Sequence, residues 1–235
     1  MINNNKITQK ALAKFWELLN FENEEGEKTM KTNAKNYICI NGKKTELTKE
    51  QLKQLGIIAE TCYLSEDGKI AHIGEYAFIV IKNDEKLGTT ELLLKDKLGE
   101  DIEFGSSNDF RTSNVKKILD KFSDEISDII GEENLVEHIV DLTADNGLKC
   151  YGTIKAKMSL FTAQMVRENV EILDEFKLDE WWWTCTPYST PKHENASWVK
   201  CVSPRGNIDN GSYYCNGGVR PFCIVKSSIF VSCEE

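Results

Sequence analysis

The chain has 235 residues, 40% of them hydrophobic and 29% charged, which is the composition of a globular protein with a packed core. That length suits one sizeable domain with a small appendage and leaves little room for two full-sized domains. The formal net charge of −9 argues against nucleic acid or an anionic membrane as a partner, because either needs clustered Lys and Arg on the protein.

Hydrophobic stretches are short throughout the sequence, and none approaches the roughly 20 consecutive apolar residues of a membrane span. Lys, Gln and Glu interrupt the first 21 residues, which therefore lack the apolar run of an export signal. We expect a protein that is cytoplasmic before cell lysis and has no membrane contact.

The first 60 residues predict a small module that contains a helix, a pair of strands and a second helix. Asn41-Gly42 lies between two short expected strands and is a strong hairpin signal. Thr48 and Gln51 match a capping box, and the helix that they open should end at Gly56. The module is too small for a core of its own, so it should dock or oligomerise. The first helix is predicted by apolar residues at helical spacing: Leu12, Phe15, Trp16 and Leu19.

Residues 61–235 predict an α+β domain. Residues 68–82 are typical of strands with a break at Gly74, and residues 89–95 should form the next strand. Ser113 is a good N-cap for an amphipathic helix that runs through Ile118 to about Ile130. A second helix is expected over residues 159–173.

The last 55 residues are built differently, because they hold all four prolines, five of the eight cysteines and four of the five tryptophans but few charges. Four strands are expected there, around residues 181–185, 198–202, 218–225 and 229–232. Neighbours on a strand point to opposite faces, so Trp182 should face one way and Trp181 and Trp183 the other. One side should be core, and the other a second layer or an exposed platform.

Two stretches between these strands are rich in Tyr, Ser, Asn and Gly: residues 188–198 and 203–214. Rigid aromatics beside short polar side chains are typical of binding surfaces, although the same residues also form ordinary turns. The sequence therefore offers the following candidate ligand-binding residues: Tyr188, His193, Asn195, Trp198, Asn207, Asp209, Tyr213 and Tyr214.

Three motifs occur in a fixed order: Ser107-Asn-Asp-Phe-Arg-Thr-Ser-Asn-Val, then Met158-Ser-Leu-Phe-Thr162, then Trp182-Trp-Thr-Cys-Thr-Pro187 followed by Gly217-Gly-Val-Arg-Pro-Phe222. The set resembles a domain family of unknown function from gut bacteria and their phages. That family is itself similar to the C-type-lectin-like fold of formylglycine-generating enzymes and of the variable proteins of diversity-generating retroelements. The resemblance covers roughly residues 61–235. It departs at Thr184, Cys185 and Thr186, where the family usually has an apolar residue, an Arg and a Ser.

The resemblance implies a C-type-lectin-like domain that binds a protein or glycan without catalysis, as an adhesin of phage or prophage origin. Its variable relatives display binding residues on loops of this terminal part. Arg220, in the Gly-Val-Arg-Pro motif, has two interpretations: it binds ligand, or it is held by a carboxylate or by backbone carbonyls. An alternative function is a structural protein of a virion, or an interaction protein, whose loops contact only its own assembly or a second copy of the chain.

An enzyme is the weaker interpretation, because His72, His138 and His193 are scattered and no nucleophile elbow or phosphate-binding glycine loop occurs. None of the eight cysteines forms a Cys-x-x-Cys pair, so we expect buried free thiols and no structural zinc. The formylglycine-type enzymes leave one alternative, a copper-dependent oxidase that uses cysteines among residues 185–223. For calcium, only Asn207, Asp209 and Asn210 cluster, and loop solvation explains them. No metal or cofactor is expected.

Overall fold

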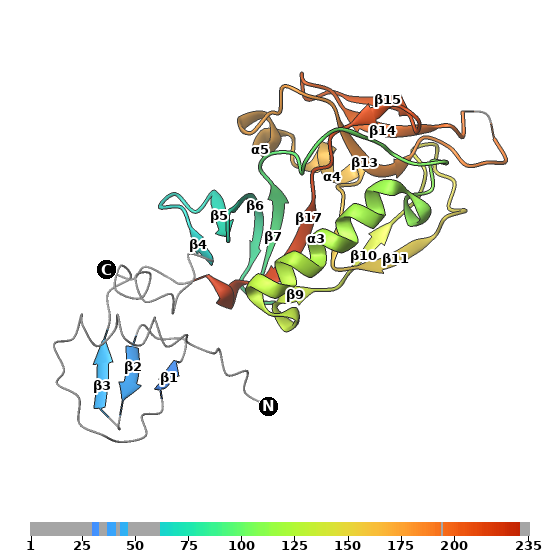
Figure 1. Cartoon of the computed structure of the whole chain (residues 1–235). Coiled ribbons are helices and arrows are strands. Elements are labelled where there is room, and N and C mark those ends of the chain that lie inside the picture. The colour runs from blue at the N-terminus through green and yellow to red at the C-terminus, as the bar shows by residue number, and fades with distance from the viewer. Residues whose placement is uncertain (1–29, 33–36, 41–42, 47–61, 194, 231–235) are drawn as a thin grey trace. The chain divides into compact units, whose positions relative to one another are not determined.

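The structure is a computed structural model that describes residues 30–32, 37–40, 43–46, 62–193 and 195–230 (Figure 1). The chain divides into two compact units, Met1–Thr61 and Cys62–Glu235. The helix predicted around residues 12–19 and the capped helix at residues 48–56 lie outside the described residues.

Three strands are described in the first unit, β1 (Met30–Thr32), β2 (Tyr37–Ile40) and β3 (Lys43–Glu46). They form an antiparallel sheet in the order β1-β2-β3. Ile40 pairs with Lys43, which leaves Asn41-Gly42 as the connection. The predicted strand pair is therefore confirmed, whereas β1 was not expected from the sequence.

The second unit is a mixed α and β structure of mostly antiparallel sheets, so the α+β class is confirmed. Its largest sheet has seven strands in the order β12-β17-β7-β6-β5-β4, and β9 pairs with β17 beside β12. The break at Gly74 is confirmed as a turn, where a φ of 59° favours glycine. The strands of this sheet are β4 (Cys62–Leu64), β5 (Ile70–Ile73), β6 (Tyr76–Asp84), β7 (Thr89–Leu94), β9 (Leu135–Val136), β12 (Met158–Ser159) and β17 (Phe222–Lys226).

Helix α3 (Asn114–Ile130) lies against one face of this sheet (Figure 1). It begins where predicted, since the Ser113 hydroxyl accepts a hydrogen bond from the backbone N–H of Lys116. The helix follows the short 3₁₀ helix η1 (Phe110–Thr112), and its end at Gly131 is followed by η2 (Glu132–Asn134). Its buried face packs on the sheet through Val115, Leu119, Phe122, Ser123 and Ile126.

The single helix expected over residues 159–173 is wrong. The structure has two short helices instead, α4 (Ala163–Glu168) and α5 (Val170–Glu175). The first begins at Ala163, after its N-cap Thr162, whereas Ser159 belongs to β12. Asn169 separates the helices: its side chain donates to the Met165 carbonyl, and its backbone leaves the helical range. Two further strands, β10 (His138–Asp141) and β11 (Thr153–Ala156), form a separate antiparallel pair.

The C-terminal strands form a second sheet in the order β13-β14-β15, built from β13 (Trp182–Pro187), β14 (Trp198–Val202) and β15 (Ile208–Ser212). The stretch 203–214, expected as a loop, is thus partly a strand, since residues 208–212 pair with β14. The last expected strand is also wrong within the described residues, where η3 (Ser227–Ile229) occupies its start. A short pair, β8 (Ile102–Glu103) with β16 (Asn216–Gly217), completes the unit.

Two clusters of buried side chains stabilise this unit, one on each face of the large sheet. Phe78 and Leu92 belong to the cluster under α3, whereas Ile79 and Leu93 belong to the cluster under α4 and α5. The same alternation separates Trp182 from Trp183, which are both 2% exposed and lie in different clusters, as the strand pattern predicted. Within the described residues, no helix is long and apolar enough to cross a membrane.

Candidate functional site

The loop between β13 and β14, residues 188–197, projects from the end of the C-terminal sheet (Figure 1). Its base is closed by a backbone hydrogen bond from the Tyr188 N–H to the Trp198 carbonyl, 3.0 Å long. The buried Asn108 side chain donates two further hydrogen bonds, to the Ser189 carbonyl at 2.7 Å and to the Trp198 carbonyl at 3.1 Å. The base of the loop is therefore fixed by a side chain from a distant part of the chain.

Asn108 is itself held in place by Tyr151, which in turn contacts Arg111 of the first sequence motif. The Tyr151 hydroxyl donates to Asn108 Oδ1 at 2.7 Å, which fixes the orientation of the amide. The Arg111 guanidinium binds the Asp109 carboxylate and lies 5.2 Å from the centroid of the Tyr151 ring. Asn108 is thus part of an internal support for the loop.

Tyr188 and Trp198 form an aromatic pair at the two ends of this loop. Their ring centroids are 5.8 Å apart with the ring planes tilted by 58°, and the Trp198 side chain remains partly exposed, at 40% for the residue. Lys200 lies two residues further along β14 on the same face, with its ammonium 5.7 Å from the Tyr188 ring centroid. Two sequence-predicted residues are therefore brought together, next to a cation that was not predicted.

The Lys200 side chain is only 9% exposed, and its ammonium has polar partners. It donates to Asn210 Oδ1 at 2.8 Å and lies 3.5 Å from Asp145 Oδ2. The second oxygen of Asp145 accepts from the Arg167 guanidinium at 2.9 Å. Burial raises the pKa of Asp145, but the Arg167 hydrogen bond and the Lys200 charge outweigh it, so the pKa lies below its usual value.

A hollow of about 240 Å³ opens beside this ion-pair network. Asp145 and Arg167 belong both to the network and to the wall of the hollow. The loop 188–197 is adjacent, because the Asn146 side chain donates to the Ser189 hydroxyl and the Asp145 N–H donates to the Pro187 carbonyl. We call this the polar hollow; it is lined by Asp141, Thr143, Ala144, Asp145, Thr162, Ala163, Gln164, Arg167 and Thr186.

The other predicted residues of the first stretch lie at the tip of the same loop. His193 and Asn195 are both exposed, and each belongs to a tight turn. The His193 N–H donates to the Thr190 carbonyl, and the Asn195 carbonyl accepts from the Trp198 N–H. Asn195 has a φ of 64°, a left-handed conformation that Asn tolerates better than most residues.

The predicted residues of the second stretch are distributed more widely. Tyr213 and Tyr214 form their own edge-to-face pair, with ring centroids 5.6 Å apart, and Tyr213 packs against the core under α3. Asn207 lies at the far end of the β14–β15 hairpin, where Val202 pairs with Ile208. Asp209 follows on β15, and its carboxylate accepts from the Asn210 N–H. Tyr213 nevertheless adjoins the loop 188–197, because its N–H donates to the Ser197 carbonyl at 2.9 Å.

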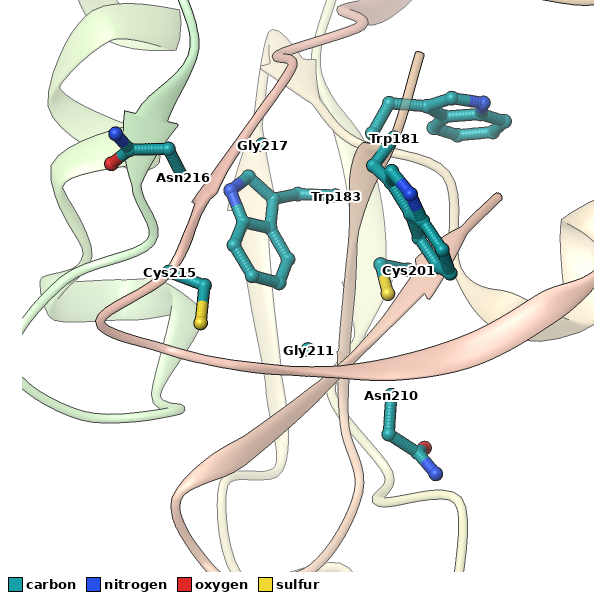
Figure 2. Close-up of a pocket in the computed structure, with 9 residues that line it drawn as sticks. Trp181, Trp183, Cys201, Asn210, Gly211, Cys215, Asn216 and Gly217 are labelled. Carbon is teal, nitrogen blue, oxygen red and sulfur yellow. The ribbon is translucent and has the colours of Figure 1, made fainter. Parts of the chain in front are cut away.

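A second hollow, of about 210 Å³, lies at the run of three tryptophans (Figure 2). Trp183 is held there between two glycines: a Cβ at Gly211 would lie 2.7 Å from the indole, and one at Gly217 would lie 2.9 Å from it. The Trp183 Nε1–H donates to the Ile102 carbonyl at 3.0 Å, so this ring is a core residue. Trp181, by contrast, is 44% exposed at the rim. The nine residues that line this hollow are uncharged: Trp181, Trp182, Trp183, Cys201, Asn210, Gly211, Cys215, Asn216 and Gly217.

Arg220 has a structural role, because backbone carbonyls hold its guanidinium in place of a ligand. Its guanidinium donates to the carbonyl oxygens of Leu94, Lys95 and Phe176 at 2.8–3.0 Å, and the residue is 1% exposed. The charge also lies 5.4 Å from the Trp182 ring centroid. Burial lowers the pKa of Arg220 to about 10. The guanidinium therefore joins β7 to the end of α5, and it is not accessible to a ligand.

The prediction that the thiols are buried is confirmed for three cysteines and is wrong for two. Cys185, Cys201 and Cys223 are buried, and burial raises the pKa of each thiol to about 12, whereas Cys150 and Cys215 are exposed. Cys62 is half-buried, the side chain of Cys39 is not described, and Cys233 lies outside the described residues. Across the described residues, no three His, Cys, Asp or Glu side chains are grouped so that they could hold a metal ion.

Sequence reasoning missed four residues of this site: Asn108, Asp145, Arg167 and Lys200. Asp145, Arg167 and Lys200 look like ordinary surface charges in the sequence, and only the tertiary structure brings them together. Asn108 had a signal, because it lies in the first motif of the resemblance. Comparisons with known proteins add nothing further, since no protein-family model, no curated protein and no solved structure matches the chain.

Proposed function

We propose that residues 62–230 form a C-type-lectin-like domain that binds a protein or glycan ligand without catalysis. The binding surface is the Tyr188–Trp198 pair with the tip of the loop 188–197, and the polar hollow continues it. The half-buried Tyr213 and the exposed Tyr214 border the loop at Ser197 but are not part of the proposed surface. The same proposal includes the phage or prophage origin that the resemblance implies, and the protein would act as an adhesin.

The observation that carries the proposal is the rigid attachment of an aromatic pair in which Tyr188 is half-buried and Trp198 is exposed. Asn108 fixes both ends of the loop, so little conformational entropy is lost when Trp198 contacts a ligand. Tryptophan and tyrosine contribute the most to binding at such surfaces, because they remove a large apolar area from water and keep a polar group. The buried Lys200 ammonium orients the Tyr188 ring on the protein side.

The test is a binding screen of the full chain against immobilised glycans and bacterial surface proteins. The variant combines Tyr188→Ala with Trp198→Ala, and the matched control is Trp181→Ala, which removes a tryptophan of similar exposure on another surface. We expect the double variant to lose the signals of the wild-type chain and to keep its circular dichroism spectrum, while the control keeps both. Equal binding by all three proteins would reject the surface.

A further inference from the structure

We infer that the polar hollow binds one sugar unit of a glycan whose next unit lies on the Tyr188–Trp198 pair. The inference rests on the proposed function and narrows its ligand from a protein or glycan to a glycan. The hollow, of about 240 Å³, is smaller than the roughly 300–1,000 Å³ of pockets for drug-sized ligands, so it suits a single ring.

The charges around the hollow nearly balance, which disfavours a free ion as its ligand. Asp145 is shared between Arg167 and Lys200, with its side chain 23% exposed. The Asp141 carboxylate accepts from the Thr143 N–H at 2.9 Å and from the Thr143 hydroxyl at 2.6 Å. Both carboxylates are therefore already bound by donors of the protein, and a neutral polar ligand is favoured.

The remaining hydrogen-bonding capacity of the hollow fits hydroxyl groups. Thr162 Oγ1 accepts from the Met165 N–H, and Thr186 Oγ1 accepts from the Ala163 N–H, so the proton of each hydroxyl can be donated to a ligand. Thr186 is 5% exposed and still lines the hollow. Its buried hydroxyl would gain a partner from a bound ligand.

Acceptors lie across the same hollow. The Thr143 hydroxyl donates to Asp141 and keeps its lone pairs, and Gln164 donates its amide to Glu168 and keeps its carbonyl oxygen. A hydroxyl group donates and accepts at once, so the hydroxyls of a sugar ring match a wall that offers both donors and acceptors.

The path from the hollow to the aromatic pair is short. The Lys200 ammonium lies 3.5 Å from Asp145 in the wall of the hollow and 5.7 Å from the Tyr188 ring centroid. An aromatic ring next to a polar hollow suits a sugar chain, because the C–H face of a sugar packs on the ring while its hydroxyls face polar groups. The ligand would span at least two units.

The test uses the full chain and a panel of methyl glycosides of glucose, galactose, mannose and N-acetylglucosamine, with saturation-transfer NMR to detect binding and titration to measure it. The two hollow variants are Gln164→Ala, an exposed position, and Thr186→Val. The controls are Glu168→Ala, which removes the Gln164 partner outside the hollow, Thr153→Val on β11, and Trp181→Ala at the second hollow.

We expect at least one glycoside to bind, with a loss of about tenfold in affinity for each hollow variant and no change for the three controls. Binding that resists both hollow variants, or that is lost in Trp181→Ala, would overturn the inference, as would the absence of binding by every glycoside. A protein ligand that binds at Trp198 in the absence of any glycoside binding would overturn the inference and leave the proposed function standing.

Discussion

The side-chain amide of Asn108 donates a hydrogen bond to the backbone carbonyl of Trp198, although the two residues are 90 positions apart. This contact joins the segment just before η1 to the candidate binding loop.

Replacing Asn108 with Ala should therefore weaken the loop and the whole unit. The Ser189 carbonyl and the Tyr151 hydroxyl would each lose a buried partner, which should reduce the free energy of unfolding by about 1–3 kcal/mol. Urea denaturation measures this, and hydrogen exchange at the Tyr188 amide should become faster. The control is Asn207→Ala, an exposed Asn whose replacement should change stability by at most about 0.5 kcal/mol. Equal effects at the two positions would contradict the role of Asn108.

Gly211 should not tolerate even a methyl group. A Cβ at this position would lie 2.7 Å from the Trp183 indole, so Gly211→Ala should cost about 1–3 kcal/mol of stability through overpacking. Combining it with Trp183→Phe should recover part of that cost, because the smaller ring makes room. Thermal unfolding of the wild-type chain, the two single variants and the double variant gives the stabilities for a double-mutant cycle. If the stability losses of the two single variants add up in the double variant, Gly211 is not required to make room for the Trp183 indole.

His138 should make the stability depend on pH below neutrality. Burial lowers the pKa of this imidazole below its ordinary value of 6.5, so the unfolded chain binds the proton more readily. The stabilising contribution is present above pH 6.5 and is lost as the pH falls through and below that value. His138→Gln should flatten the loss of melting temperature between about pH 7 and 5. An unaltered pH profile in His138→Gln would contradict this account.

The thiols should fall into two classes of reactivity. Cys150 and Cys215 are exposed, whereas the pKa of Cys185, Cys201 and Cys223 is raised to about 12 by burial. Because the thiolate is the reactive form, the exposed pair should be alkylated at least about tenfold faster at pH 8. Peptide mapping after timed alkylation measures the rates, and denaturant should abolish the difference. Equal rates for Cys201 and Cys215 in the native protein would be inconsistent with the structure.

Local rules predicted the parts of the fold that local interactions decide. Ser113 caps α3, Asn41-Gly42 connects two paired strands, and Trp182 and Trp183 face different clusters, each from a pattern only a few residues long. Local rules did not predict the strand at residues 208–212, because only Ile208 favours a strand by its propensity. The strand is stabilised by its pairing with β14. The division of the expected helix at Asn169 was also missed, since apolar spacing continues across it.

The site was predictable only in part, for a related reason. Tyr188 and Trp198 could be proposed from composition, because aromatic residues in a polar loop stand out in the sequence. Their partner Lys200 could not, since its burial depends on Asp145 and Asn210, which reach it from other elements. Interactions between distant residues are decided by the tertiary structure, and a single sequence carries little information about them.

The most direct test of the binding surface is the affinity of two single variants, Trp198→Ala and Trp181→Ala, for the ligand found in the screen, measured by isothermal titration calorimetry. The residues are 40% and 44% exposed, so each variant removes a similar area of indole from the surface. Trp198→Ala should cost about 2 kcal/mol of binding free energy, or roughly thirtyfold in affinity, with little change in melting temperature. Trp181→Ala should bind like the wild-type chain. A Trp198→Ala protein that melts at a lower temperature and binds with unchanged affinity would show that the aromatic pair is structural and that the ligand binds elsewhere.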